Sequence, residues 1–101
     1  MSGAVGRVHV VLSFRARPER LADLRKLLGD LVAPTQAEPG CIMYDLFEND
    51  ADPLNLVYIE EWESRAALDV HRQTAHVKEA LAALGPLIAE APDDRFFYKA
   101  R

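Results

Sequence analysis

The spacing of the apolar residues changes repeatedly along the chain, and this limits the folds that are open to it. In residues 8–15 apolar side chains occupy every second position, which predicts a strand, because alternate residues of a strand face opposite sides. From Pro18 to Val32 they recur at every third or fourth position, which predicts one face of a helix. Pro34 is predicted to stop this helix near Thr35.

Three further strands and a pair of short helices are predicted in the rest of the chain. The strands are expected at residues 41–48, 55–63 and 95–99. A polar turn at residues 49–53 separates the first two, which are therefore expected to form an antiparallel hairpin. Ser64 and Thr74 are predicted to cap two consecutive helices, and Gly85-Pro86 ends the second.

The predicted order is therefore strand, helix, strand, strand, helix pair, strand. This order is typical of the ferredoxin-like, split βαβ plan, an α+β fold in which helices cover one face of a four-stranded antiparallel sheet. All 101 residues are expected to form a single domain, with Met1–Gly6 as a loose start to the first strand.

Both faces of the predicted sheet carry apolar side chains. Ile42, Tyr44 and Leu46 are expected on one face of their strand, with Met43 and Phe47 on the other. A sheet that is covered by helices on one side only should present polar residues on its second side. The sequence therefore predicts that the second face packs against another copy of the chain, which makes a homodimer.

Composition and charge exclude several classes of partner. A net charge of -4 and a pI of about 5.3 argue against nucleic acid, which requires clustered positive charge. No apolar run approaches the roughly 20 residues that span a bilayer, so no membrane is expected. The single Cys41 is typical of a reducing compartment, which predicts a cytoplasmic protein. No glycine-rich nucleotide loop is present, and no cofactor is expected.

The most informative run extends from Tyr58 to His76, where the end of a strand is followed by two short helices. Tyr58, Glu60 and Trp62 share one strand face and are expected to point into the interior. A buried carboxylate needs a partner, and one of the two histidines is predicted to supply it to Glu60. Tyr44, on the preceding strand, is a further candidate for the wall of a substrate pocket.

His71 and His76 are the candidate acid–base residues, because imidazole titrates near neutral pH. The helix dipole favours a neutral ring for His76, in a first turn, and a cation for His71, near a helix end. His76 is therefore predicted as the general base and His71 as the proton donor, with a structural role for both as the alternative. No metal is expected, because a five-residue spacing turns the rings about 140° apart on a continuous helix and no third ligand lies nearby in sequence.

Together with Glu38-Pro39-Gly40, the Glu60–Ser64 run and the pattern His71-x-x-Thr74-x-His76, these residues resemble the antibiotic biosynthesis monooxygenase family. The resemblance covers nearly the whole chain. It implies a dimeric α+β barrel, in which two ferredoxin-like subunits pair through their sheets and each holds a pocket between sheet and helices. It also implies a cofactor-independent monooxygenase that oxidises a small aromatic or quinol with O₂.

The resemblance also implies roles for individual residues. His76 or His71 would be the base that deprotonates the substrate, and Trp62, Tyr44 and Tyr58 would flank its aromatic ring. A deprotonated, electron-rich phenol can itself pass an electron to O₂, so the protein needs to supply only a base and a dry cavity.

Related branches of the fold leave other functions open. Haem-degrading relatives use an Asn in the first strand and a Trp in the helix after the third strand, and this sequence has neither there. A sugar-phosphate isomerase of quorum sensing shares the His71-x-x-Thr74-x-His76 pattern, and N–H groups after Thr74, with Arg72 and Lys78, could bind a phosphorylated small molecule. A non-catalytic ligand-binding dimer with structural histidines is the third alternative.

Overall fold

The computed structural model describes residues 6–101, so the expected loose start at Met1–Gly6 lies outside the described residues except at Gly6. Along the chain the elements are β1 (Val8–Arg15), the 3-10 turn η1 (Pro18–Arg20), α1 (Leu21–Asp30), α2 (Val32–Gln36), β2 (Cys41–Asn49), β3 (Asp52–Trp62), α3 (Arg65–His71), α4 (Ala75–Leu84), the 3-10 turn η2 (Gly85–Leu87) and β4 (Asp93–Tyr98). The predicted strands and helices are all present, and their ends differ from prediction by a few residues.

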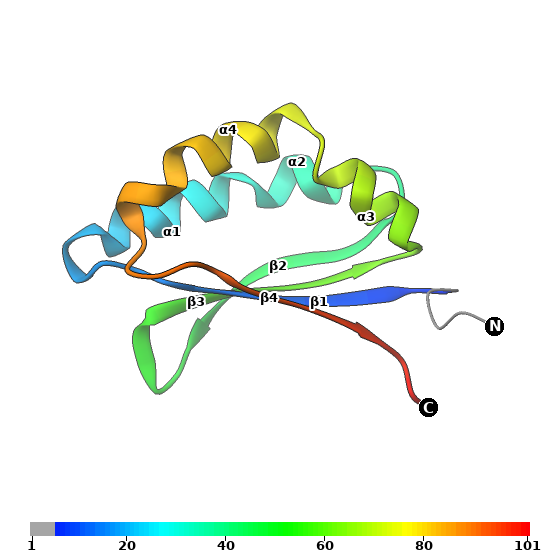
Figure 1. Cartoon of the computed structure of the whole chain (residues 1–101), viewed down its shortest axis with the longest axis horizontal. Coiled ribbons are helices and arrows are strands. Elements are labelled where there is room, and N and C mark those ends of the chain that lie inside the picture. The colour runs from blue at the N-terminus through cyan, green and yellow to red at the C-terminus, as the bar shows by residue number, and fades with distance from the viewer. Residues whose placement is uncertain (1–5) are drawn as a thin grey trace.

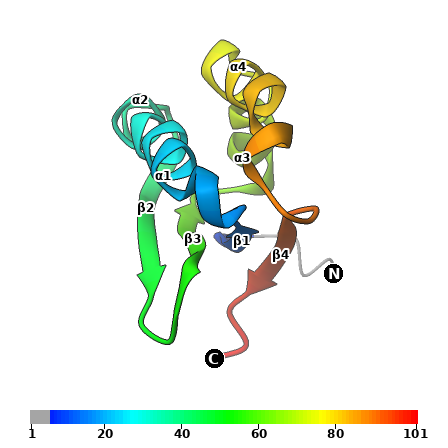
Figure 2. The same ribbon diagram turned by 90° about the vertical axis from the view of Figure 1, so that its left-hand side faces the viewer.

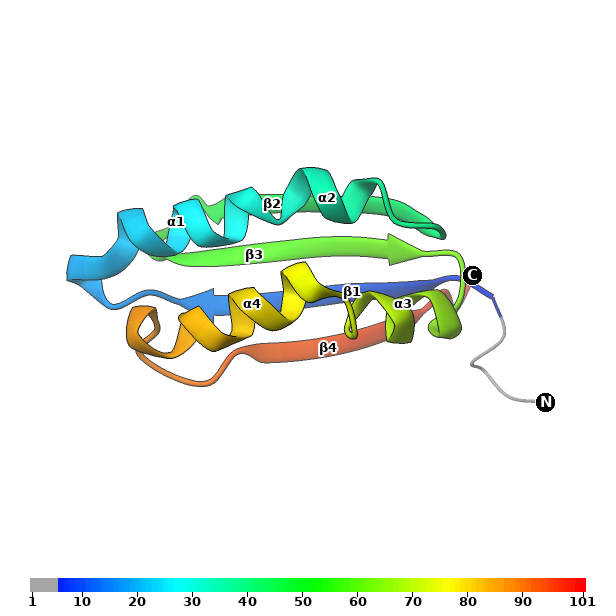
Figure 3. The same cartoon turned by 90° about the horizontal axis from the view of Figure 1, so that it is seen from above.

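The strands form one antiparallel sheet in the order β2-β3-β1-β4. Helices α1 to α4 all lie on one face of this sheet (Figure 1). Seen from above, α1 and α2 run along the β2–β3 side, while α3 and α4 run along the β1–β4 side (Figure 3). Figure 2 shows the same two rows of helices end-on, above the twisted sheet. The ferredoxin-like α+β prediction is confirmed.

The first long helix breaks before Pro34 rather than at it. Helix α1 ends at Asp30, and Pro34 lies inside the short α2 that follows. A proline has no N–H to donate to the carbonyl four residues earlier, and its ring crowds that carbonyl, which here belongs to Asp30. The proline therefore breaks the helix one turn upstream of its own position, which was not predicted, whereas the helical stretch as a whole ends at Gln36, close to the predicted stop near Thr35.

The β2 strand contains a bulge that the alternation of its sequence does not indicate. Cys41 pairs with Trp62 and Met43 pairs with Glu61, so Ile42 is the extra residue between them. Ile42 is 43% exposed. The prediction that it shares one strand face with the buried Tyr44 was wrong. A bulge shifts the alternation of the strand by one residue, which a period-two pattern cannot represent.

The core lies between the helices and the inner face of the sheet. The inner residues of β1 and β3 form pairs across the strands: Val8 with Trp62, Val10 with Glu60, Leu12 with Tyr58 and Phe14 with Leu56. The Tyr58 hydroxyl donates to the Leu28 carbonyl at 2.5 Å. The same carbonyl also accepts from the Leu31 N–H at 3.3 Å, so the tyrosine adds a second donor at the last turn of α1 and ties this helix to the sheet.

Both predicted helix caps are present. The Ser64 hydroxyl accepts from the Ala67 N–H at the start of α3, and the Thr74 hydroxyl accepts from the Val77 N–H at the start of α4. Thr74 therefore separates two helices, and His71 and His76 do not lie on one continuous helix. Within residues 6–101 none of the helices has the length and apolar character needed to cross a bilayer.

Candidate active site

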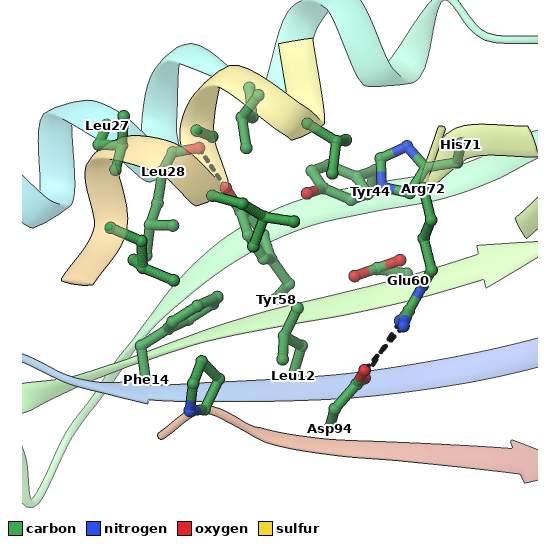
Figure 4. A pocket seen from close by; sticks show the side chains of 16 residues that line it. Leu12, Phe14, Leu27, Leu28, Tyr44, Tyr58, Glu60, His71, Arg72 and Asp94 are labelled. Atoms are coloured by element: carbon green, nitrogen blue, oxygen red, sulfur yellow. Dashed lines mark hydrogen bonds and ion pairs between the residues drawn. The ribbon is translucent and has the colours of Figure 1, made fainter. Parts of the chain in front are cut away.

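A cavity of about 340 Å³ lies between the two rows of helices and the sheet (Figure 4). Its walls are mostly apolar, with Leu12 and Phe14 on the sheet side and Leu28 and Leu84 among the helix residues. The polar side chains gather at one end. They are Tyr44, Glu60, His71, Arg72 and Asp94. A cavity that is apolar over most of its wall and polar at one end is typical of a site for a small organic molecule.

Glu60 lies on the cavity wall and is almost fully buried. Across the sheet it pairs with Val10 on β1 and with Tyr44 on β2, so the neighbours on both sides are buried. The Trp62 indole N–H donates to its carboxylate at 2.9 Å. Burial raises the pKa of Glu60 to about 7, against the lowering effects of the Trp62 hydrogen bond and of nearby Arg72. Glu60 therefore exchanges a proton near neutral pH.

The Glu60→Gln variant is expected to lose the decrease in stability that Glu60 causes in the wild type between about pH 5 and pH 8. Because the pKa is about 7 in the folded chain against an ordinary 4.5, the folded state keeps a proton that the unfolded state has released. The contribution of Glu60 to the wild-type free energy of unfolding should therefore fall by about 3 kcal/mol as pH rises through this interval, from the difference in pKa, while the lowered pKa of His71 acts in the opposite direction in both proteins. Urea unfolding at both pH values measures it. Parallel profiles for the two proteins would contradict the assignment.

The carboxylate that contacts the histidines is Glu38, not Glu60. One oxygen of Glu38, Oε2, lies 2.9 Å from Nδ1 of His71 and 2.6 Å from Nε2 of His76. Glu38 and His71 are almost fully buried, and the His76 side chain is 28% exposed. The prediction that a histidine partners Glu60 was wrong, because Trp62 takes that position.

Gly40 lets the start of β2 approach α3 closely enough for this contact. Its φ is +82°, a conformation that side-chain-bearing residues rarely adopt. A Cβ at this position would lie 2.6 Å from the Cβ of Ala67 on α3. The Glu63 N–H also donates to the Gly40 carbonyl at 2.9 Å. The turn that carries Glu38 is therefore packed tightly against the helix that carries His71.

The contact with Glu38 sets the tautomer of His71. A carboxylate only accepts, so Nδ1 of the neutral ring carries the proton and donates it to Glu38. Among residues 6–101 Nε2 of His71 has no hydrogen-bond partner, and His71 lines the main cavity whereas Glu38 does not. The ring therefore offers the cavity an unprotonated nitrogen, which is the arrangement of a general base held by a carboxylate.

The pKa of His71 moves in the direction opposite to the one predicted from the helix dipole. Burial lowers the pKa of His71, and the Glu38 hydrogen bond opposes this only in part. Desolvation of a nearly enclosed ring outweighs the partial charge at the end of a short helix. The resting ring is therefore neutral. His76 does not line the main cavity but a second, shallower hollow with Asp30 and Glu79.

The aromatic residues of the predicted pocket differ in their positions. Tyr44 and Tyr58 line the cavity, with ring centroids 4.6 Å apart. Burial raises the pKa of both phenols, which keeps them protonated. Trp62 is fully buried behind the cavity wall, where its ring lies 4.7 Å from that of His71. Trp62 therefore supports Glu60 and His71 and does not face the cavity.

Arg72 and Asp94 form an ion pair at the polar end of the cavity. The Arg72 guanidinium donates to both carboxylate oxygens of Asp94, at 2.9 and 3.2 Å (Figure 4). The same guanidinium stacks on the ring of Phe96, 4.9 Å from its centroid. Because its charge is already paired, Arg72 contributes little net positive charge to the cavity.

The three residues Glu38, His71 and His76 are also the group that could hold a metal ion. Their donor atoms lie within 4.8 Å of one another. No metal was expected from the sequence, because the five-residue spacing turns the two rings apart on a continuous helix and no third ligand lies nearby in the chain. The structure supplies that ligand from Glu38, which is 33 residues away from His71. Sequence reasoning missed Glu38 as a site residue, although its position before Pro39-Gly40, a turn, was a usable signal.

Comparison with known proteins identifies the family to which the chain belongs. A model of the antibiotic biosynthesis monooxygenase family matches residues 7–83, which include Glu38, Glu60, His71 and His76. A Mycobacterium tuberculosis protein, named as a candidate monooxygenase, is 43% identical over 81 residues, which are 80% of this chain and 79% of that protein. A Bacillus subtilis protein with the same kind of name is 32% identical over 80 residues, 79% of this chain and 83% of that protein.

Solved structures agree with these sequence relationships. The structure of the same Mycobacterium tuberculosis protein matches with a TM-score of 0.90 and 35% identity, over 94% of this chain and 96% of that chain. The crystal structure of a Caulobacter crescentus protein, described as a candidate antibiotic biosynthesis monooxygenase, matches with a TM-score of 0.90 and 30% identity, over 97% of this chain and 93% of that chain. The whole fold is therefore similar, β4 included.

Proposed function

The chain belongs to the antibiotic biosynthesis monooxygenase family, and from this membership we propose that it is a cofactor-independent monooxygenase for a small, neutral, electron-rich aromatic such as a quinol. The observation that carries the proposal is His71, which lines an apolar cavity while Glu38 holds its other ring nitrogen at 2.9 Å. A monooxygenase-like function agrees with the names of the relatives. The substrate class and the oxidation chemistry are the proposed part.

The proposed reaction starts with a proton transfer to His71. Nε2 takes the phenolic proton, and the Glu38 carboxylate stabilises the resulting imidazolium. The phenolate passes one electron to O₂, and the phenoxyl radical and superoxide combine to form a carbon–oxygen bond. The resulting peroxide takes the proton back from His71, which gives a hydroperoxide and restores the neutral base. Loss of water from the hydroperoxide leaves a quinone carbonyl, so one oxygen atom enters the product and the other leaves as water. The apolar walls hold the reactants together and exclude bulk solvent.

The charges at the polar end favour a neutral substrate. Arg72 is paired with Asp94, and Glu60 and Asp94 are themselves acidic, so the cavity offers little attraction for a phosphate. At the start of α4 the Val77 N–H is already bonded to the Thr74 hydroxyl. These contacts favour the quinol over the phosphorylated small molecule that an isomerase would bind.

Oxygen uptake tests the proposed function. The purified chain, treated with chelator and dialysed, is supplied with a panel of hydroquinones and dihydroxynaphthalenes in an oxygen electrode. Consumption of one O₂ for each quinone formed, without release of H₂O₂ and unchanged by chelator, is the expected result, because the second oxygen atom leaves as water. Saturable binding of the same compounds without oxygen uptake would instead assign the chain to the non-catalytic ligand-binding alternative.

We also propose that the chain is a homodimer that pairs through the outer face of the sheet. This face exposes Phe47, Ile59 and Phe97 and lies opposite the helices. The Ile59→Glu variant should therefore weaken dimerisation by at least roughly tenfold, because it places a charge in an apolar interface. Light scattering over a concentration series measures the change. Val70→Glu, at an exposed apolar position on the helix side, is the matched control and should leave the dimer intact.

A further inference from the structure

We propose that Glu38, His71 and His76 form a binding site for one divalent transition-metal ion, such as Zn²⁺, and that metal in this site inhibits the oxidation. The site itself is independent of the proposed function, whereas the inhibition rests on it. The proposed oxidation needs no metal, so this ion would act as a regulator or inhibitor of His71, the proposed base.

The three donor atoms are suited to such an ion in kind and in position. Two imidazole nitrogens and one carboxylate oxygen are typical ligands of Zn²⁺ and its neighbours, which leave further coordination positions to water. The donors lie within 4.8 Å of one another, and Glu38 Oε2 is within 2.9 Å of both rings. Ligands around a tetrahedral Zn²⁺ with bonds of about 2.1 Å are about 3.4 Å apart, so small side-chain rotations suffice.

The ligands come from three separate segments that the core already holds in place. Glu38 lies in the turn before β2, His71 at the end of α3, and His76 in the first turn of α4. Thr74 caps α4 and also donates from its hydroxyl to the His71 carbonyl at 2.8 Å, so the relative position of the two histidines is braced. An ion would therefore find most of the site preformed.

A route for the ion leads through the second hollow. This hollow is lined by His76 together with the carboxylates of Asp30 and Glu79, and the His76 ring is partly exposed there. Asp30 is paired with Lys26 at 3.0 Å, so Glu79 is the carboxylate beside this opening that favours the approach of a cation over that of an anion. The metal would enter from this side, away from the substrate cavity that His71 lines.

Metal binding would change what His71 offers to the cavity. A neutral imidazole carries one ring proton, and the metal would take the Nδ1 lone pair that this proton now covers. The proton would then sit on Nε2, on the cavity side. His71 would become a hydrogen-bond donor with no free lone pair toward the substrate, so it could no longer act as a base.

Isothermal titration of the chelator-treated chain with ZnCl₂ alone tests the site without any substrate. We expect one Zn²⁺ per chain, and binding at least roughly tenfold weaker in Glu38→Gln and His76→Gln. His9→Gln, on the outer sheet face, and Cys41→Ser are the matched controls and should bind as the wild type does. Thermal unfolding without metal checks that each variant is folded.

These experiments test the metal site, the inhibition by metal and the proposed function separately. No binding at micromolar Zn²⁺, or binding that persists in folded His76→Gln, would overturn the site. Binding with no fall in oxygen uptake would overturn the inhibition. A chain that binds Zn²⁺ but oxidises none of the aromatic compounds would keep the site and remove the proposed function. A Co²⁺-loaded sample provides a second readout, because its visible absorption reports nitrogen and oxygen ligands without a thiolate.

Discussion

The His71→Gln variant is expected to oxidise the proposed aromatic substrate about 10²–10⁴-fold more slowly than the wild type, the usual contribution of a positioned base. Gln retains an amide N–H that can donate to Glu38 but has no titratable nitrogen. Because His71 is buried and held by Glu38, we expect its loss to slow the chemical step and not substrate binding. Oxygen uptake at saturating substrate measures it, with a fall in kcat and little change in KM.

The same measurement on His76→Gln distinguishes the two histidines. His76 contacts Glu38 and the second hollow but not the main cavity, so its loss should lower the rate far less than the loss of His71. His9→Gln, on the opposite sheet face, is the matched control. A larger loss in His76→Gln than in His71→Gln would restore the assignment of His76 as the base, which the helix dipole alone favours.

The Trp62→Ala variant is expected to lose about 3–5 kcal/mol of unfolding free energy, the typical cost of truncating a large buried aromatic. Trp62 is fully buried, packs on His71 and donates its indole N–H to Glu60. Truncation leaves a cavity and removes the hydrogen-bond donor of a buried carboxyl group. Urea unfolding at about pH 7 measures the loss, and it should be accompanied by a lower rate because two cavity residues lose their support.

Trp62→Phe separates the contribution of the buried ring from that of the hydrogen bond to Glu60. It keeps most of the ring volume but removes the indole N–H, so it should cost less stability than Trp62→Ala. Because the Trp62 hydrogen bond lowers the pKa of Glu60, the Phe variant should raise that pKa further and shift the pH dependence of stability upward. A stability loss in Trp62→Ala below about 1 kcal/mol would contradict the packing role.

Much of the fold could be predicted because its signals are local. The alternation in residues 8–15 and the caps at Ser64 and Thr74 depend on neighbours within a few positions, and the structure confirms them. The bulge at Ile42 could not be placed in this way, because the pairing with β3 decides where the alternation shifts. The early end of α1 is itself a local effect, because the proline acts on the carbonyl four residues earlier, and a stop placed beside the proline comes too late.

The candidate site was predicted in part. The shared inner face of Tyr58, Glu60 and Trp62 follows from their spacing in one strand, and all three are buried. Which of these side chains reach the cavity does not follow from spacing, because it depends on the helices above. Trp62 is covered by its neighbours, whereas Tyr58 and Glu60 remain on the cavity wall.

The sequence by itself determined the order of the elements, the inner face of each central strand and the presence of two histidines around a helix cap. These features follow from the period of the apolar residues and from local hydrogen bonding. Only the tertiary structure decided which carboxylate meets the imidazoles and which ring faces the cavity. Glu38 lies 33 and 38 residues from its partners, and Gly40 leaves the space in which the turn that carries Glu38 packs against α3. The protonation of His71 was decided in the same way, because desolvation depends on the packing around the ring and not on its place in the helix.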